Sequence, residues 1–528
     1  MVEARPTPAV RAALPAILLV MFLGALDQTV MAAALSTIAG ELHALDRMPA
    51  ILTAYLAAAT AGMPLTGKLG DTYGRKRVLT WSLLLFIAGA ALSSSAQTLA
   101  ELIAFRAVQG LGGGGLMIGA QSVIGELVSP RERGRYLGYV GAAYLLAIVA
   151  GPLAGGAVVD NFSWRWIFYA YLPLGILALI LVARSLHLPP PVSQPRVDYV
   201  GAALLSMSIV AVMLLSTTGI YSGPGWLAPA LWAAAALTVG GWLAAARHAE
   251  DPIINPALFR DPAFTIPAAI SFLIGFALFS AVSFLPAFLQ IALGMSATSS
   301  GLMLIALMSG LLVTTVVSGQ LIRRSGRYRS YPILGTALAA AGMLLFSMLN
   351  AASGVPAVLL ASVLLGLGVG LVMQVMILAV QNAVEQRNLG SATAVVLFLR
   401  QMGSALGVAL LGSLITARFA AKVHTGLAER LGNDLNSLTP QAIAGLPAAD
   451  RAAVGEAFGS ALPPVFLYAA GLLVVAFVLA LLLPQRELRT TAYGDSDAAA
   501  GTGPESSASR NNGRARATTR RGKGNRAR

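Results

Sequence analysis

Long apolar runs are the feature that most limits what this chain can fold into. A helix needs about 20 mostly apolar residues to cross the roughly 30 Å hydrocarbon core of a bilayer. Fourteen such runs follow one another along the 528 residues, separated by short polar or glycine-rich segments. They centre on Leu23, Ala59, Phe86, Gly114, Leu146, Leu174, Ile209, Ala236, Leu278, Gly310, Met343, Val369, Leu406 and Val475. We therefore predict an all-α membrane protein with fourteen transmembrane helices.

The composition excludes a water-soluble enzyme or binding module. Hydrophobic residues make up 57% of the chain and charged residues 11%, whereas soluble domains contain about 25% charged residues. The absence of cysteine excludes disulfides, thiolate catalysis and cysteine-ligated metals. The four histidines lack metal-ligand spacing, and Leu69 stands where a P-loop needs Ser or Thr. We expect no enzymatic activity, no metal and no other cofactor.

The placement of lysine and arginine indicates the orientation in the membrane. Cytoplasmic loops of membrane proteins are enriched in these residues. With the N-terminus in the cytoplasm, the predicted cytoplasmic segments hold most of the 36 basic residues. We predict a multi-pass protein of the cell membrane with both termini cytoplasmic. The net charge of +14 then reflects basic loops and a basic tail, so we expect neither a nucleic-acid partner nor an obligate protein partner.

An internal repeat divides the chain. GKLGDTYGRKR at 67–77 matches GQLIRRSGRYR at 319–329 with an offset of 252, and QGLGGGGLM at 109–117 resembles LGLGVGLVM at 365–373 with an offset of 256. Two six-helix repeat bundles with two inserted helices account for this pattern, an architecture typical of transporters that rock two halves around a central site. The predicted units are an N-terminal bundle at 1–186, inserted helices and linkers at 187–262, a C-terminal bundle at 263–485 with an external loop at 418–461, and a disordered basic cytoplasmic tail at 486–528.

Three charged residues fall inside predicted spans. Asp27 lies within the first span, and an intramembrane carboxylate usually marks a substrate pathway, a proton relay or a counter-ion. A purely structural ion pair is the alternative. Arg106 in the fourth span is an attractive partner for Asp27. Arg400 in the thirteenth span has no evident carboxylate partner, so contact with backbone carbonyls and contact with substrate both stay open.

The segment GKLGDTYGRKR, between the second and third spans, combines a membrane anchor with a candidate cytoplasmic gate. Glycines permit tight turns and close helix approach, and Asp71 can pair with Arg75 or a neighbouring arginine. A charged latch of this kind would hold the inward face shut, while a simple positive-inside anchor is the alternative. The candidate gate residues are Gly67, Asp71, Gly74, Arg75 and Arg77. Arg323 occupies the position of Asp71 in the second repeat, so a latch there works differently or is absent.

Two further sets of residues are candidates for function. In AIVAGPLAGG at 147–156, a proline interrupts a glycine-rich helix, which predicts a bend or soft point unless the motif serves packing alone. The candidate hinge residues are Gly151, Pro152, Gly155 and Gly156. Polar side chains within spans are candidates to line a cavity, or else form interhelical hydrogen bonds. These are Gln28, Gln109, Gln374, Gln381, Asn382 and Arg400.

Taken in order, these motifs resemble those of the major facilitator superfamily, and within it the fourteen-helix drug:proton antiporters of the multidrug efflux type. The resemblance rests on LDQTV at 26–30, GKLGDTYGRKR at 67–77, RAVQGLGGG at 106–114, AGPLAGG at 150–156 and WRWIFYAYLPLG at 164–175. It implies proton coupling by Asp27 and Arg106, gating by Asp71 and Arg75, and an antiporter helix containing Gly151 and Pro152.

The resemblance implies export of amphipathic organic compounds, lipophilic cations among them, in exchange for protons by alternating access. The expected partners are thus a small-molecule substrate, protons and membrane lipid. An exporter of the same fold dedicated to one endogenous metabolite, lipid or antibiotic is the alternative, and a non-transporting membrane sensor is a more remote one. Departures from the group's pattern at Ala32, Ser36 and Tyr171 leave the substrate open.

Overall fold

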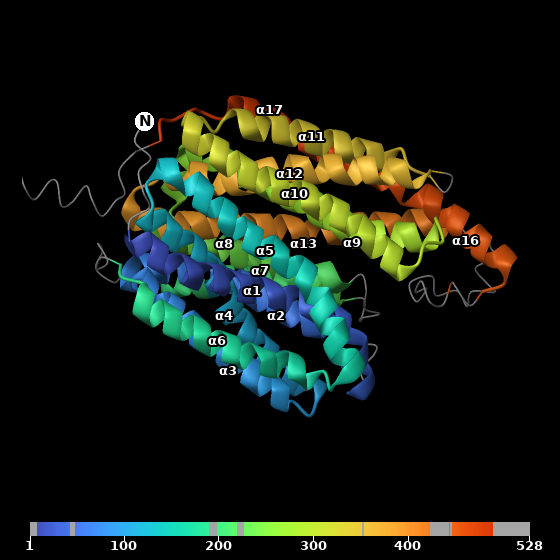
Figure 1. Ribbon diagram of the computed structural model, residues 1–528, viewed down its shortest axis with the longest axis horizontal. Helices are drawn as coiled ribbons and strands as arrows, with labels where there is room; N and C mark the ends of the chain where they lie inside the picture. The colour runs from blue at the N-terminus through green and yellow to red at the C-terminus, as the bar shows by residue number, and fades with distance from the viewer. Residues whose placement is uncertain are drawn as a thin grey trace, which may run out of the picture.

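The computed structural model describes residues 8–42, 48–188, 198–218, 226–350, 353–422, 443 and 446–488. Its architecture is all-helical, as predicted (Figure 1). The long helices are α1 (Pro8–Glu41), α2 (Met48–Tyr73), α3 (Arg75–Ser95), α4 (Leu99–Leu127), α5 (Pro130–Asn161), α6 (Arg165–Ser185), α7 (Tyr199–Thr218), α8 (Leu227–His248), α9 (Pro262–Ile291), α10 (Ala297–Ser325), α11 (Ser330–Ser347), α12 (Val355–Ala383), α13 (Leu389–Lys422) and α17 (Phe466–Leu482). Each of the fourteen predicted spans is centred within one of these helices.

Length and composition qualify thirteen segments of the described chain as membrane spans. The helix left out is α7, whose apolar stretch Tyr199–Leu215 is shorter than the others. The protein is therefore a multi-pass membrane protein. Short 3₁₀ turns, η2 (Pro256–Arg260), η3 (Gln386–Asn388) and η5 (Pro463–Val465), join some of the helices.

Local sequence signals set where the helices begin and end. Thr98 and Glu101 form a reciprocal capping box at the start of α4. Pro130 occupies the first turn of α5, where its missing N–H costs no helical hydrogen bond. Gly74 joins α2 to α3 with φ 94°, and Gly326 ends α10 with φ 68°. Both backbone conformations favour glycine.

The helices form two halves that lie side by side. One half consists of α1–α6 and the other of α9–α13 with α17 (Figure 1). In the first half α4 packs against α2 and α3, and in the second α12 packs in the same way against α10 and α11. The halves meet where α5 contacts α10 and where α2 contacts α13. These repeated partnerships agree with the internal repeat in the sequence.

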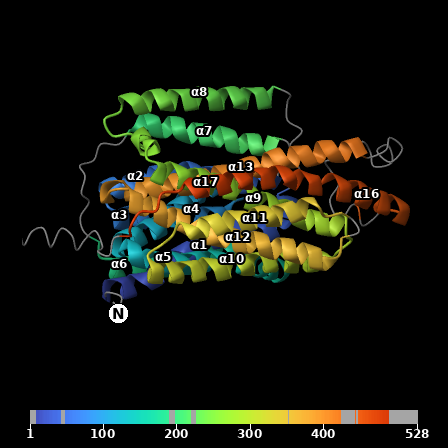
Figure 2. The same cartoon turned by 90° about the horizontal axis from the view of Figure 1, so that it is seen from above.

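The helices α7 and α8 pack on each other outside the two halves (Figure 2). Their link to the rest is made by α7, which contacts α2 and α13. Lys68 of α2 also pairs with Asp251 in the segment after α8. The inserted pair is therefore placed beside the seam between the halves. The unit boundaries drawn from the sequence stay a prediction.

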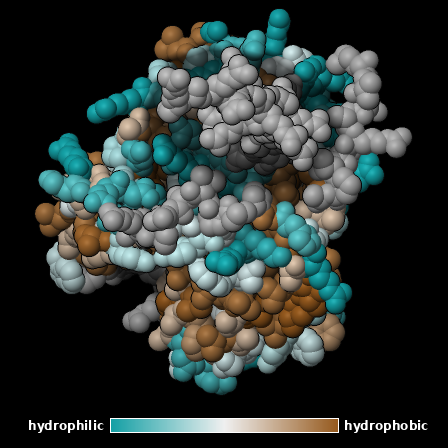
Figure 3. All heavy atoms as spheres, turned by 90° about the vertical axis from the view of Figure 1, so that its left-hand side faces the viewer, coloured by the Kyte–Doolittle hydropathy of each residue, from teal (hydrophilic) through white to brown (hydrophobic). Residues whose placement is uncertain are grey.

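One end of the bundle carries the turns α2–α3, α4–α5, α10–α11 and α12–α13 together with the end of α17, and we call it the basic end. It is the left-hand end in Figure 1, and Figure 3 shows many hydrophilic residues on this face together with a hydrophobic patch in its lower part. It corresponds to the side that the sequence predicts to be cytoplasmic. That orientation stays a prediction.

The segment 418–461 is not a loop throughout, contrary to expectation. Residues up to Lys422 continue α13, and Ala448–Ala461 forms α16. Val454 and Ala457 repeat at helical spacing and pack with Phe419 and Ile291, so α16 is anchored on an apolar face. Positions 423–442, 444 and 445 lie outside the described residues.

The predicted tail begins with residues that are held against the bundle. Arg486 donates from Nη2 to both carboxylate oxygens of Asp261 at 2.9 Å, and Asn382 donates to the carbonyl oxygen of Glu487 at 3.2 Å. The predicted start of the disordered tail at 486 is therefore wrong, because Arg486 is held by Asp261, the N-cap of α9, and Glu487 by Asn382 of α12. Residues 489–528, where the rest of the predicted tail falls, lie outside the described part.

Candidate functional site

The structure brings Asp27 of α1 and Arg106 of α4 together in the interior of the first half. Nη1 of Arg106 donates to both carboxylate oxygens of Asp27 at 2.8 Å. Gln109 completes the group, since its Oε1 accepts from Arg106 and its Nε2 donates to Asp27, both at 3.0 Å. Asp27, Arg106 and Gln109 are each 0% exposed. A charged pair is therefore held where water is excluded.

Aromatic rings enclose this pair. The guanidinium carbon of Arg106 lies 4.3 Å from the ring centroid of Tyr55 and 5.8 Å from that of Phe168, within the range of cation–π attraction. Tyr171 of α6 is also buried beside Asp27 and packs edge-on against Phe86. The low-polarity surroundings strengthen the attraction between the two charges.

The glycines of RAVQGLGGGG position Arg106 by bringing backbones together. A Cβ at Gly110 would overlap the carbonyl group of Tyr55 in α2, and one at Gly114 would overlap that of Ala59. A Cβ at Gly112 would overlap the backbone nitrogen of Phe86 in α3. Small residues allow such close helix approach in membranes. The glycines of this segment therefore serve close helix packing.

The hydrogen-bonding capacity of this group is not filled. Nε and Nη2 of Arg106 are buried without a hydrogen-bond partner in the described structure. Buried polar atoms are nearly always paired with protein or water. The site therefore has unfilled donors beside its one carboxylate.

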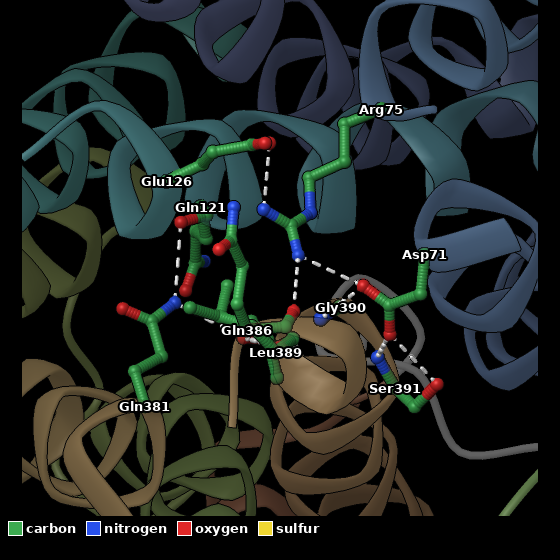
Figure 4. A network of polar contacts seen from close by, with 10 residues as sticks. Asp71, Arg75, Gln121, Glu126, Gln381, Gln386, Leu389, Gly390 and Ser391 are labelled. Atoms are coloured by element: carbon green, nitrogen blue, oxygen red, sulfur yellow. Dashed lines mark hydrogen bonds and ion pairs between the residues drawn. The ribbon is translucent and has the colours of Figure 1, made fainter. Parts of the chain in front are cut away.

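A second polar network ties the two halves together at the basic end (Figure 4). Asp71, in the last turn of α2, accepts hydrogen bonds from the backbone N–H groups of Gly390 at 2.8 Å and Ser391 at 2.7 Å. The hydroxyl of Ser391 donates to Asp71 at 3.0 Å. These are the first residues of α13, where the helix dipole favours an anion. Together with Arg75, we call these residues the first latch.

Arg75 connects the first latch to a residue that sequence reasoning missed. Its Nη2 donates to Asp71 at 2.9 Å and to the carbonyl oxygen of Gln386 at 3.1 Å, while its Nη1 donates to Glu126 at 2.6 Å. Asp71, Arg75 and Glu126 are all buried. Glu126 ends an apolar helix three residues before Ser129, and its acidic side chain among apolar neighbours was the available signal.

The structure separates the remaining gate candidates. A Cβ at Gly67 would lie 2.8 Å from the carbonyl oxygen of Gly390, so this glycine permits the α2–α13 crossing. Gly74 supplies the turn described above. Arg77 is exposed and, within the described chain, makes no hydrogen bond or ion pair with the first latch. It therefore stays outside the network, although the sequence grouped it with the gate.

Two residues expected as candidates for a cavity lining lie at the basic end instead. The side-chain amide of Gln381 donates to the backbone carbonyl oxygen of Gln121 at 3.2 Å and to Thr393 Oγ1 at 3.0 Å. The backbone carbonyl oxygen of Gln381 accepts from Arg133 at 3.3 Å. Asn382 holds Glu487, as described above. Of the two alternatives left open by the sequence, hydrogen bonding between segments is the one found for both residues in this state, at the end of α12 where the halves touch.

The other polar candidates lie further inside. Gln28 donates to the sulfur of Met117 at 3.5 Å. Gln374 is buried, and its Oε1 has no hydrogen-bond partner in the described structure. Arg400 is 7% exposed and lies near Tyr144 of α5, and within the described residues no carboxylate forms an ion pair with it. The sequence left the partner of Arg400 open, and the structure places a residue of the opposite half there.

The candidate hinge is a continuous part of α5. The helix runs through Pro152 without interruption from Pro130 to Asn161. A Cβ at Gly151 would overlap the hydroxyl of Thr29, so α5 lies directly on α1 at this point. Gly155 is buried, and a Cβ at Gly156 would meet open space. Close packing is visible here, and the hinge role stays a prediction.

At the end opposite the basic end, Glu41 joins the first and sixth helices. It accepts from Trp164 Nε1 at 2.7 Å and from Arg165 Nη1 at 2.5 Å. The hydrogen bond from Arg165 lowers the pKa of the Glu41 carboxyl below its ordinary value. Arg165 also donates to the carbonyl oxygen of Ala96 at 3.1 Å, so the cluster fastens α1, α3 and α6.

Comparisons with known proteins give this geometry a context. The sequence profile described as Major Facilitator Superfamily matches residues 17–408. The chain is 34% identical over 428 residues to the multidrug transporter protein MdtP of Bacillus subtilis, covering 81% of this chain and 78% of that protein. It is 31% identical over 489 residues to multidrug resistance protein 3 of the same organism, covering 90% and 95% of the two chains.

Solved structures share the fold at low sequence identity. The proton:xylose symporter XylE superposes with a TM-score of 0.62 at 14% identity, covering 93% of this chain and 99% of that one. This likeness shows the arrangement of helices and nothing about what the chain carries.

Proposed function

This chain belongs to the major facilitator superfamily of transporters, and we propose that it is a proton-coupled antiporter that exports amphipathic organic compounds. The family is one of transporters and not of enzymes. The names of two bacterial relatives, a multidrug transporter and a multidrug resistance protein, support export of drug-like compounds. Lipophilic cations are the first class to test, because they are among the amphipathic compounds whose export the sequence resemblance implies.

The observation that carries the proposal is the fully buried pair of Asp27 and Arg106. A carboxylate in the interior of a membrane protein costs free energy and is retained mainly where it serves transport, proton relay or charge compensation. Its protonation would weaken the attraction to Arg106, whose Nη1 donates to both carboxylate oxygens of Asp27. Proton binding at Asp27 is thereby linked to the packing of α1 against α4.

We place the steps of the cycle as follows. With the basic end closed by the first latch, Asp27 takes up a proton from the opposite side and substrate leaves. The halves then rock, the latch opens, and Asp27 loses its proton at the predicted cytoplasmic side, where substrate binds. A membrane potential contributes about 2.3 kcal/mol per charge per 100 mV. The potential therefore helps to drive export when each exchange cycle carries net positive charge inward. Gln28 and Gln374 are the proposed polar contacts along the substrate path.

The proposal predicts a cell-membrane location with both termini in the cytoplasm. In that orientation the basic end faces the cytoplasm and the first latch closes the inward side. The alternative of a dedicated exporter for one endogenous metabolite, lipid or antibiotic has the same cycle and differs only in substrate range.

The test is dye transport in energised inverted membrane vesicles with internal pH recorded at the same time. The parent protein is expected to move a lipophilic cationic dye in exchange for protons, and Asp27→Asn to lose that exchange. Glu385→Gln is the matched control, since Glu385 pairs with Arg387 in an exposed position, at 69% and 62% exposure. Coupled exchange by Asp27→Asn contradicts the assignment of Asp27. Failure of the parent with a broad dye panel contradicts general drug export and favours the dedicated exporter.

A further inference from the structure

A second ion pair crosses between the halves at the basic end. Arg323, near the end of α10, donates from Nε to Oε1 of Glu132, in the first turn of α5, at 2.9 Å. The two side chains are 24% and 27% exposed. Arg131 strengthens the crossing by donating from its own Nε to the carbonyl oxygen of Arg323 at 3.4 Å. The contact thus joins α10 of one half to α5 of the other.

The backbone at this crossing repeats the backbone at the first latch. A Cβ at Gly319 would overlap the carbonyl oxygen of Gly134, just as a Cβ at Gly67 would approach that of Gly390. The repeat offsets relate the two sites, because 67 + 252 = 319 and 134 + 256 = 390. The α2–α13 and α10–α5 crossings are therefore equivalent positions of the internal repeat.

The charges at the two crossings are opposite. At the first, the start of α13 presents free backbone N–H groups, and the anion Asp71 binds them. At the second, the start of α5 carries Pro130, which lacks an N–H, and Glu132, an anion favoured at a helix N-terminus. An aspartate at the repeat position of Asp71 would be repelled by Glu132. The arginine found there, Arg323, is attracted.

We infer that Glu132 and Arg323 form a second latch with the charges of the first exchanged, and that both latches must release for the basic end to open. This inference concerns the closing of one end of the bundle and does not depend on the transported compound. The two latches differ in strength. Asp71 is buried and accepts several hydrogen bonds, while the second pair is partly open to water, where an ion pair changes an equilibrium by about two- to fivefold.

The test uses a single reporter thiol. The native chain has no cysteine, so Thr315→Cys introduces the sole reactive group. Thr315 is 2% exposed and lies on α10 against Gly138 and Gly141 of α5, inside the second latch. Its rate of alkylation by a water-soluble maleimide, in purified protein in lipid nanodiscs, reports how often the basic end opens.

Reversing the charge of one residue, and then exchanging the charges of both, tests whether the attraction between Glu132 and Arg323 keeps the basic end closed. Glu132→Arg and Arg323→Glu, each added to the reporter, are expected to raise the alkylation rate about two- to fivefold or more. The double variant Glu132→Arg/Arg323→Glu restores opposite charges and is expected to return the rate close to the parent value. Glu385→Arg is the matched control, because it changes a charge at the same end without crossing the halves. It is expected to leave the rate unchanged.

The inference is overturned if neither single reversal changes the rate, or if the double variant stays as reactive as the single ones. The milder pair Glu132→Gln and Arg323→Gln replaces the reversals where those fail to fold. Each of the milder variants is expected to raise the rate above that of the parent. A rate equal to the parent's in both contradicts the second latch.

Discussion

The guanidinium of Arg106 holds the carboxylate of Asp27 through a single nitrogen. Nη1 donates to both oxygens of Asp27 and to Gln109, while Nε and Nη2 are buried without a partner in the described structure. One nitrogen of the guanidinium is therefore hydrogen-bonded, while the other two are not. We expect that a small rotation of Arg106 would exchange one set of donors for the other, so that the position of its charge would follow the charge of Asp27.

Removal of Arg106 should destabilise the protein strongly. Arg106→Leu leaves the Asp27 carboxylate without its cation in the membrane interior, and breaking a buried pair from one side costs about 3–5 kcal/mol. Thermal unfolding in detergent measures the loss. The double variant Asp27→Asn/Arg106→Leu is expected to recover a large part of the stability, because no charge is then left unpaired. Equal destabilisation in the single and double variants argues against the pair as the cause.

Loss of the Asp71 charge should open the basic end. Asp71→Asn removes a carboxylate that accepts hydrogen bonds from Gly390, Ser391 and Arg75, and hydrogen bonds to charged groups contribute about 1.5–3 kcal/mol each. Spin labels on cysteines introduced at the ends of α2 and α13 should report longer distances. The control is Arg77→Gln in the same turn, since Arg77 is exposed. If the two variants give the same distance distributions, Asp71 does not hold the basic end closed.

Glycines of α4 should not tolerate a methyl group. Gly114→Ala forces the Cβ into the carbonyl of Ala59, and such overpacking costs about 1–3 kcal/mol. Gly240→Ala in α8 is the matched control, because a Cβ there would have no heavy atom within 4 Å. Thermal unfolding should show a lower midpoint for the α4 variant and an unchanged or slightly raised one for the α8 variant. Similar midpoints would mean that α4 and α2 can move apart without cost.

The Glu41 cluster should make stability depend on pH in the acid range. The pKa of Glu41 is lowered in the folded protein, so its contribution is present above the ordinary glutamate pKa of about 4.3 and is lost as pH falls through the folded pKa. The parent should therefore lose up to about 1 kcal/mol more than Glu41→Gln on acidification, a value typical of exposed pairs. Unfolding midpoints at pH 7 and pH 3.5 measure this difference. Parallel shifts in the two proteins contradict the role of Glu41.

The sequence could predict the number and order of the helices and the pairing of Asp27 with Arg106. The helices follow from the length of each apolar run, and the pair follows from the high free-energy cost of an unpaired charge in the membrane. Apolar length requires the spans, and two opposite charges inside a membrane have few alternatives to each other. Gly67 and Asp71 could be singled out because a glycine that permits close helix approach stands four residues before a carboxylate that can pair with Arg75.

Contacts between the halves could not be predicted in the same way. Gln381 and Asn382 are polar residues in an apolar helix, and nothing in the local sequence tells a cavity from a seam. Their partners, Gln121 and Glu487, lie far away in the chain. The roles of Glu126 and Glu132 likewise depend on where α4 and α5 meet the other half. The helix α16 was missed because its apolar positions are mostly alanines and glycines, which give a weak periodic pattern.

The backbone contacts of α4 with α2 and α3 have a mechanical consequence. Where glycines place backbone directly on backbone, no flexible side chains lie between the helices to absorb a displacement, and packed protein interiors compress little. The half built from α1–α6 is therefore expected to move as a rigid body. In the rocking motion that we propose, a displacement of this half at the basic end would therefore be carried to the opposite end of the membrane, so that release of the contacts at the basic end and opening of the other side become one event.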